Sequence, residues 1–185
     1  MTPATSLEPV PVVVAAGSNL GDRQAHLDRG LAALRHVMEV DRVSGAVDTP
    51  PEDGSPQPEF RNLVVTGRTC LSPEAFLAEL LRIEGEEGRV RTVPGAARTL
   101  DLDLIFFGAA VRSGPDPIVP HPRWQRRPFV VGPLLEVAPD LVDPATGRSV
   151  RQVAESLGLV PSPRRREMAS PARSAAGLPS ASRAP

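Results

Sequence analysis

Residues 99–108 read TLDLDLIFFG, a stretch in which polar and apolar side chains alternate before an apolar end. Alternation with a period of two is typical of a β-strand that buries one of its faces. The leucines of this stretch are expected to face the core. Asp101 and Asp103 are expected to share the opposite face, with their Cα atoms about 7 Å apart.

The residues upstream of this strand complete a recognisable order of elements. The predicted elements are a strand at 10–15, a turn at 17–22 (GSNLGD), a helix from Asp22 to about His36, strands at 40–47 and 60–69, and a helix opened by Ser72 and Pro73. Either Asp22 or Asn19 can cap the first helix. The apolar stripe of the second helix consists of Phe76, Leu77, Leu80, Leu81 and Ile83. The order βαββαβ predicts an α+β fold, a ferredoxin-like sandwich with helices on one face of an antiparallel sheet.

The remaining segments are predicted loops and C-terminal additions to this sandwich. Residues 48–59 (DTPPEDGSPQPE) contain four prolines and a glycine, which indicates a loop. Residues 88–98 (GRVRTVPGAAR) form a second loop, which is expected to be mobile and to become ordered when ligand binds. Residues 118–141 are punctuated by proline and include a short helix, and residues 149–157 predict a final helix.

Length and composition favour one compact domain. The chain has 185 residues, 41% of them apolar, and its formal net charge is −1. We expect the domain to span residues 10–160, after a flexible N-terminus at 1–9. Residues 161–185 hold five prolines and five arginines and predict a disordered tail. An electrostatic tether is the weaker alternative for that tail.

The composition also excludes several classes of protein. The near-neutral charge gives no indication of nucleic-acid binding, and no basic leader or long apolar run indicates secretion or membrane insertion. Cys70 is the only cysteine, so an intrachain disulfide framework is impossible, and we expect a location in the reducing cytoplasm. We also expect the protein to be a monomer. All 21 basic residues are arginine, which excludes a Walker-A loop and lysine Schiff-base chemistry. Codon bias is the simplest explanation of the arginine excess.

Asp101 and Asp103 are the first candidates for chemistry. Two carboxylates on one strand face are hard oxygen ligands, which suit Mg²⁺ held together with substrate phosphates. Such a pair can also hold two metal ions about 4 Å apart for an in-line displacement. Taken alone, however, this pattern is more often the solvated face of a sheet.

Basic residues near the aspartates favour the functional interpretation. The candidates are Arg89, Arg91, Arg98, His121 and Arg127. The planar, permanently charged guanidinium fits phosphate oxygens and can stabilise a transferring phosphoryl group. Each arginine considered singly could be a surface residue. His26 and His36 fall in the first predicted helix and are expected to face solvent.

Four segments of the chain resemble the 6-hydroxymethyl-7,8-dihydropterin pyrophosphokinases, which transfer pyrophosphate from ATP to a pterin alcohol in folate biosynthesis. The segments are GSNLGD (17–22), the DTPP loop with FRN (48–62), GRVR…RTLDLDL (88–104) and VPHPRW…RPF (119–129). The resemblance extends over about residues 12–155. Its most specific part is RTLDLD after GRVR.

The resemblance implies a role for each matching residue. Asp101 and Asp103 would bind two Mg²⁺ ions that bridge the ATP phosphates, and Arg89 and Arg98 would stabilise the transferring group. The residues implied in binding ATP or its phosphates are Arg91, His121, Arg127 and Glu84, the last acting through Arg89 or beside the adenine. The residues implied in binding the pterin are Thr49, Pro50, Asn62, Phe129 and Phe60, which replaces a tyrosine common in the family. GSNLG is implied to be a structural turn.

The sequence departs from the family pattern just before Arg98. The family commonly has arginine, tryptophan, glycine and proline there, whereas this chain has residues 93–97, VPGAA, which are one residue shorter and lack the tryptophan. Two other functions stay open. One is a ferredoxin-like nucleotide-binding regulatory module without catalysis, and the other is a metal-dependent phosphodiesterase.

Overall fold

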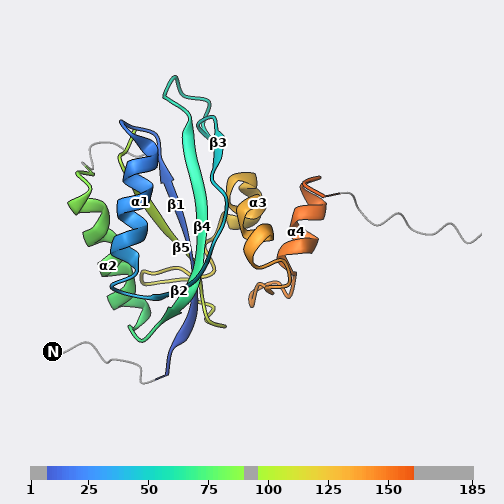
Figure 1. Cartoon of the computed structure of the whole chain (residues 1–185). Coiled ribbons are helices and arrows are strands. Elements are labelled where there is room, and N and C mark those ends of the chain that lie inside the picture. The colour runs from blue at the N-terminus through green and yellow to red at the C-terminus, as the bar shows by residue number, and fades with distance from the viewer. Residues whose placement is uncertain (1–7, 90–95, 161–185) are drawn as a thin grey trace, which may run out of the picture.

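The computed structural model describes residues 8–89 and 96–160, which form an antiparallel sheet with helices on both of its faces (Figure 1). The expectations for the N-terminal residues before Glu8, for the centre of the 88–98 loop and for the 161–185 tail fall outside these residues. The strands are β1 (Val10–Ser18), β2 (Glu39–Val43), β3 (Val47–Thr49), β4 (Phe60–Thr69) and β5 (Asp101–Phe107). They are arranged as β2-β4-β1-β5, with β3 also paired to β4, which confirms the predicted ferredoxin-like order.

Two helices cover one face of the sheet, as predicted. They are α1 (Arg23–Leu34), capped by Asp22, and α2 (Pro73–Glu86), capped by Ser72. Helices start at these residues because each side-chain oxygen accepts a backbone N–H of the first turn. Leu27 and Leu34 of α1 and Phe76 of α2 pack with alternate β1 and β5 residues in one hydrophobic core.

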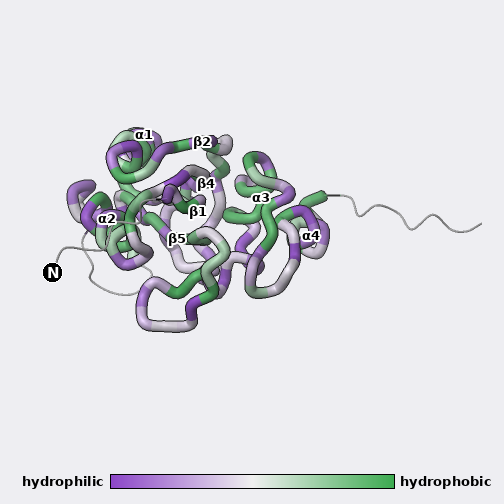
Figure 2. The backbone as a smooth tube through the Cα atoms, turned by 90° about the horizontal axis from the view of Figure 1, so that it is seen from below, coloured by the Kyte–Doolittle hydropathy of each residue, from purple (hydrophilic) through white to green (hydrophobic). Residues whose placement is uncertain are grey.

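The C-terminal additions, whose place relative to the sheet was not predicted from the sequence, cover part of the other face. They consist of the short helix η1 (Trp124–Arg126), α3 (Pro128–Val137) and α4 (Val150–Ser156), which begins with a Ser149 capping box. Trp124, Val131 and Val153 form a second core with Val64 and Ile105 of the sheet. Figure 2 shows the two apolar regions on either side of the central strands.

Three details differ from the sequence predictions. The strand expected at 40–47 is interrupted at 44–46, because the buried Ser44 hydroxyl accepts the Val64 N–H and the Gly45 N–H donates to Glu136. Leu81 is 42% exposed, since it lies beyond the edge of the buried stripe of α2. His26 does not face solvent freely, because its Nδ1 lies 2.8 Å from a carboxylate oxygen of Glu87.

Gly67 marks a close approach of β2 to β4, and we expect Gly67→Ala to destabilise the fold by about 1–3 kcal/mol. A Cβ atom at this position would overlap the Glu39 carbonyl oxygen and the Met38 side chain. Thermal or urea unfolding measures the loss. Gly85→Ala is the matched control, because a Cβ there meets no atom within 4 Å and alanine favours the helix. An unchanged melting temperature for Gly67→Ala would contradict the register of these strands.

Candidate active site

A pocket of about 660 Å³ lies on the same face of the sheet as α3 and α4, over the part that these helices leave uncovered. Its floor is one cross-strand row, in which Gly17 of β1 pairs with Asn62 of β4 and with Asp101 of β5. The residues that line it include Thr49, Pro50, Pro51, Glu52, Asp53, Phe60, Asn62, Arg89, Arg98, Asp101, Asp103, Arg123, Arg127 and Phe129. Segments distant in the sequence therefore meet at this pocket.

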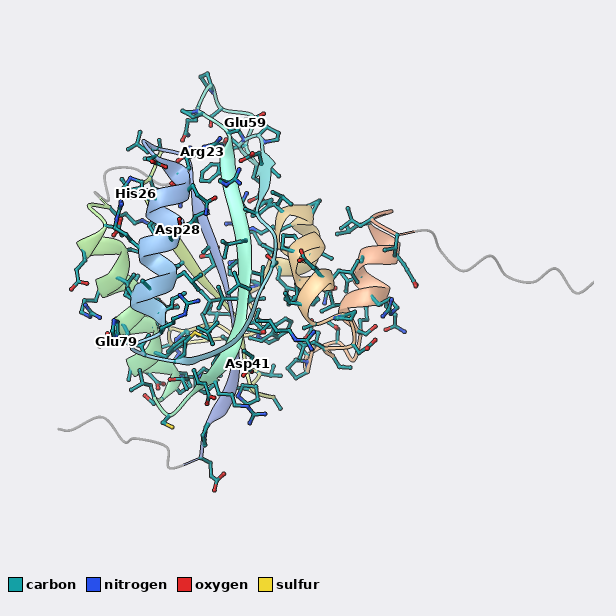
Figure 3. All side chains as sticks on the ribbon, in the orientation of Figure 1. Arg23, His26, Asp28, Asp41, Glu59 and Glu79 are labelled. Carbon is teal, nitrogen blue, oxygen red and sulfur yellow. The ribbon has the colours of Figure 1, made fainter. Side chains whose placement is uncertain are left out.

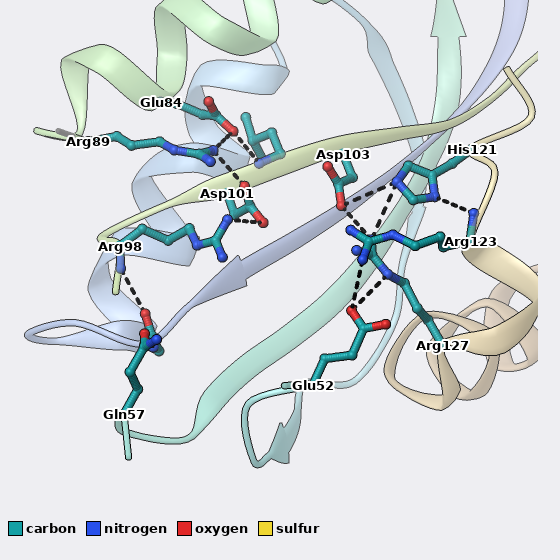
Figure 4. Close-up of polar contacts among 12 residues, drawn as sticks. Glu52, Gln57, Glu84, Arg89, Arg98, Asp101, Asp103, His121, Arg123 and Arg127 are labelled. Atoms are coloured by element: carbon teal, nitrogen blue, oxygen red, sulfur yellow. Dashed lines mark hydrogen bonds and ion pairs between the residues drawn. The ribbon is translucent and has the colours of Figure 1, made fainter. Parts of the chain in front are cut away.

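Asp101 and Asp103 share one face of β5, as their spacing predicts, while Leu102 and Leu104 are buried on the other. Asp101 is held by two arginines (Figure 4): Arg89 contacts its Oδ1 atom, and an Arg98 guanidinium nitrogen lies 3.1 Å from its Oδ2 atom. Charge-assisted pairs of this kind fix a carboxylate more firmly than neutral hydrogen bonds do.

Arg89 is aimed at Asp101 by the C-terminal end of α2. Gly88 has a φ of +78°, which suits glycine, and Arg89 N–H donates to the Glu84 carbonyl at 3.1 Å. This closes the helix in the pattern of a Schellman motif. The Glu84 side chain is only 2% exposed, and its Oε1 atom accepts both the Arg89 guanidinium and the Leu102 N–H. Glu84 thus links α2 and Arg89 to β5 at Leu102, the residue between the two aspartates.

Arg98 is positioned by the turn that follows β1. Asn19 Oδ1 accepts the Arg98 N–H at 2.8 Å, and Asn19 N–H donates to the Arg98 carbonyl at 3.1 Å. The guanidinium carbon lies 5.5 Å from the centre of the Phe60 ring, a cation–π distance. Asn19, in the GSNLGD segment expected to be structural, therefore anchors a pocket arginine.

Asp103 is paired with Arg127, which the C-terminal additions bring to the sheet. Arg127 donates to Asp103 Oδ2 at 2.8 Å, and its guanidinium carbon lies 5.5 Å from the Phe129 ring. His121 lies behind this pair, with Nε2 4.0 Å from Asp103 Oδ2. Burial lowers the pKa of His121 below its ordinary value, which favours the neutral ring at pH 7. His121 Nδ1 accepts the Arg123 N–H at 3.2 Å, and an Arg127 guanidinium nitrogen lies 3.5 Å from Nε2.

An amide and two aromatic rings form the remaining wall of the pocket. Asn62 is 7% exposed and donates to the Thr49 hydroxyl at 2.8 Å. Gly17 makes room for this side chain, since a Cβ atom there would lie 2.7 Å from Asn62 Oδ1. Phe60 and Phe129 also line the pocket. A planar ligand with hydrogen-bonding edges fits such a wall.

The structure brings most of the candidate residues to this one pocket. Glu84 and His121 do not line it but contact lining residues, and Arg91 lies outside the described residues. Glu52, Asp53 and Arg123 were not expected here. Apart from a polar loop and a run of arginines, no local pattern indicates these three residues, because their proximity depends on the tertiary fold.

Asp101 and Asp103 are the residues that could hold a metal ion. Across residues 8–89 and 96–160, no group of three or more histidine, cysteine, aspartate or glutamate side chains could do so. Two carboxylates alone leave coordination positions for water and phosphate oxygens, as Mg²⁺ prefers. The donor set therefore fits Mg²⁺ bound together with a substrate.

No described helix has the length and apolarity needed to cross a membrane.

Fold and pocket together define a class: an α+β sandwich protein with a carboxylate pair, an arginine cluster and a partly aromatic wall in one pocket. The family profile described as 7,8-dihydro-6-hydroxymethylpterin-pyrophosphokinase matches residues 13–139. The chain belongs to this family.

Relatives of known name agree with this assignment. The chain is 42% identical over 147 residues to the 2-amino-4-hydroxy-6-hydroxymethyldihydropteridine pyrophosphokinase of Synechocystis sp., covering 78% of this chain and 75% of the relative. It is 36% identical over 141 residues to the protein of the same name from Bacillus subtilis, covering 75% and 84%.

A solved structure shows the same fold. It is wild-type HPPK-DHPS from Plasmodium falciparum, with a TM-score of 0.65 at 12% identity over 81% of this chain. This chain spans 45% of that longer chain, and at this identity the likeness establishes the fold alone.

Proposed function

We propose that the protein transfers pyrophosphate from ATP to 6-hydroxymethyl-7,8-dihydropterin, giving AMP and the pterin diphosphate, in folate biosynthesis. The observation that carries the proposal is the division of one pocket into two chemically different halves. One half presents Asp101, Asp103 and their arginines, which suit a metal-bound polyphosphate. The other half presents Asn62 and two aromatic rings, which suit a planar heterocycle.

Asp101 and Asp103 would hold two Mg²⁺ ions together with the ATP phosphates. When bound, these ions supply neutralising charge to the phosphates and align them. Asp101 is paired with Arg89 and Arg98 in the described structure, and Asp103 with Arg127. Carboxylates that turn to a cation would release these arginines to the phosphate oxygens of the substrate. The pocket would thus exchange its internal ion pairs for pairs with the substrate.

The pterin would bind against the amide and aromatic wall. Asn62 and the backbone at Thr49 and Pro50 would contact its hydrogen-bonding edge, and Phe60 and Phe129 would stack on its faces.

The reaction forms a bond between the substrate hydroxyl oxygen and the β-phosphorus of ATP. The bond from that phosphorus to the oxygen shared with the α-phosphate breaks, AMP leaves with the electron pair, and the hydroxyl proton passes to solvent. Arginines around Asp101 and Asp103 would stabilise the negative charge on the transferring group. Positioning and electrostatics can carry such a transfer with little proton chemistry from the protein.

Product analysis tests the proposal and separates it from its alternatives. With ATP, Mg²⁺ and the pterin alcohol, we expect AMP and pterin diphosphate in equal amounts, resolved by ion-exchange chromatography. Omitting the pterin should abolish AMP formation. ADP as product would indicate single phosphoryl transfer, hydrolysis without pterin would indicate a phosphodiesterase, and nucleotide binding without turnover would indicate a regulatory module. Each of these outcomes would contradict the proposed function.

A further inference from the structure

Loop 50–59, the segment between β3 and β4, places an acidic residue against the pocket arginines (Figure 4). Glu52 Oε2 lies 3.3 Å from Arg127 Nε and 3.9 Å from an Arg123 guanidinium nitrogen. These arginines come from the segment that carries η1 and α3. Glu52 therefore joins two walls of the pocket that are separate in the sequence.

The two carboxylates on Arg127 are not equivalent. Asp103 belongs to β5, which is paired with β1 in the sheet, and accepts a 2.8 Å hydrogen bond from Arg127. Glu52 belongs to a loop, is 45% exposed and lies near Arg127 Nε without the geometry of a hydrogen bond. The Arg127 side chain is only 7% exposed, and its Nε atom makes no hydrogen bond to any described residue. A buried donor of this kind favours a better acceptor than Glu52 provides.

We propose that Glu52 is a displaceable internal anion, which competes with the nucleotide phosphates for Arg127 and Arg123 and so sets the affinity for ATP. The inference rests on the proposed function, because it takes the arginines to be phosphate ligands. An incoming polyphosphate offers Arg127 Nε a charged oxygen, and two anions repel each other at the same guanidinium. Glu52 is the partner that leaves, because its side chain is exposed and its loop is free of regular structure.

Displacement of Glu52 also links the two halves of the pocket. Pro50 and Pro51 precede Glu52 in the same loop and line the wall beside Asn62. When phosphates take the arginines, loop 50–59 loses its ion pair across the pocket. The nucleotide thereby frees the loop that contacts the second substrate. Removing the Glu52 charge should strengthen phosphate binding and reduce the effect of nucleotide binding on loop 50–59.

The test compares Glu52→Gln with wild type, using calorimetric titration of inorganic tripolyphosphate and of a non-hydrolysable ATP analogue with Mg²⁺. We expect the Kd for both to fall about 3- to 5-fold, the size expected for a partly exposed ion pair. Glu59→Gln is the charge-matched control, because Glu59 is exposed, ends the same loop and does not line the pocket. Its Kd values should stay within about 1.5-fold of wild type, and the gain in Glu52→Gln should shrink in 0.5 M salt.

Hydrogen exchange supplies a second measurement. The analogue should speed amide exchange at residues 52–55 in wild type, whereas Glu52→Gln should exchange quickly in either state. An unchanged or higher Kd in Glu52→Gln would overturn the proposal. An equal fall in Kd in Glu52→Gln and Glu59→Gln would overturn it too. The tripolyphosphate titration does not depend on AMP formation, so a failed transfer assay would refute the proposed function without deciding this point.

Discussion

Asp101→Asn and Asp103→Asn are each expected to lower turnover by at least about 10²-fold while the protein stays folded. Each variant keeps the shape of the side chain but loses one negative charge from the β5 face that lines the pocket. That charge would hold the Mg²⁺ ions that neutralise the ATP phosphates. The rate of AMP formation at saturating Mg²⁺ measures the effect.

Stability should change little in these variants, since both carboxylates are partly exposed, at 23% for Asp101 and 34% for Asp103. Partly exposed ion pairs contribute about 1 kcal/mol or less. Asp41→Asn is the matched control, because Asp41 is an exposed strand aspartate on β2 that does not line the pocket (Figure 3). If either pocket variant turns over within a few-fold of wild type at saturating Mg²⁺, the metal assignment is wrong.

Local pattern was sufficient to predict the regular elements of the sandwich. The strand expected at 60–69 is β4 residue for residue, and Asp22 and Ser72 cap the helices they were expected to open. The hydrophobic period of a strand or helix and the residue that caps a helix are local properties, so they can be predicted from a single sequence. The break at Ser44 and the second helical layer could not be foreseen in this way. Both depend on tertiary contacts, from Ser44 to β4 and from α3 to the far face of the sheet.

In the candidate site too, local spacing predicted some features, and the others depend on the tertiary fold. A spacing of two residues placed Asp101 and Asp103 on one face. The basic candidates near them followed from the chemistry of arginine and histidine, and the pterin-binding residues were inferred from the family resemblance. Nothing local distinguishes Glu52 from other loop acids, because its partners Arg123 and Arg127 are about seventy residues further along the chain. Asn19 is a similar case, since its hydrogen bonds to Arg98 exist only once β1 and β5 are paired.

Glu84 should be sensitive to substitution although it does not line the pocket. Its carboxylate is buried and accepts hydrogen bonds from Arg89 and from the Leu102 N–H. Glu84→Ala would leave a largely buried guanidinium and a backbone N–H without this acceptor. Loss of one member of a buried pair costs about 3 kcal/mol. For a chain of this size, that corresponds to a fall in melting temperature of roughly 6–12 °C.

Glu84→Gln separates the positioning of Arg89 from the stability of the fold. The glutamine oxygen can still accept the Leu102 N–H, so the free energy of unfolding should fall by only about 1 kcal/mol. Arg89 would lose its buried counter-charge and settle elsewhere, and the turnover number should fall about 10-fold with little change in the KM for the pterin. Glu79→Gln is the control. Glu79 lies on the same helix (Figure 3) but forms a surface pair with Arg82, and both measurements should stay near wild type. If both Glu84 variants keep the wild-type turnover number per folded molecule, Glu84 supports the fold alone and Arg89 is positioned by Asp101 and the end of α2.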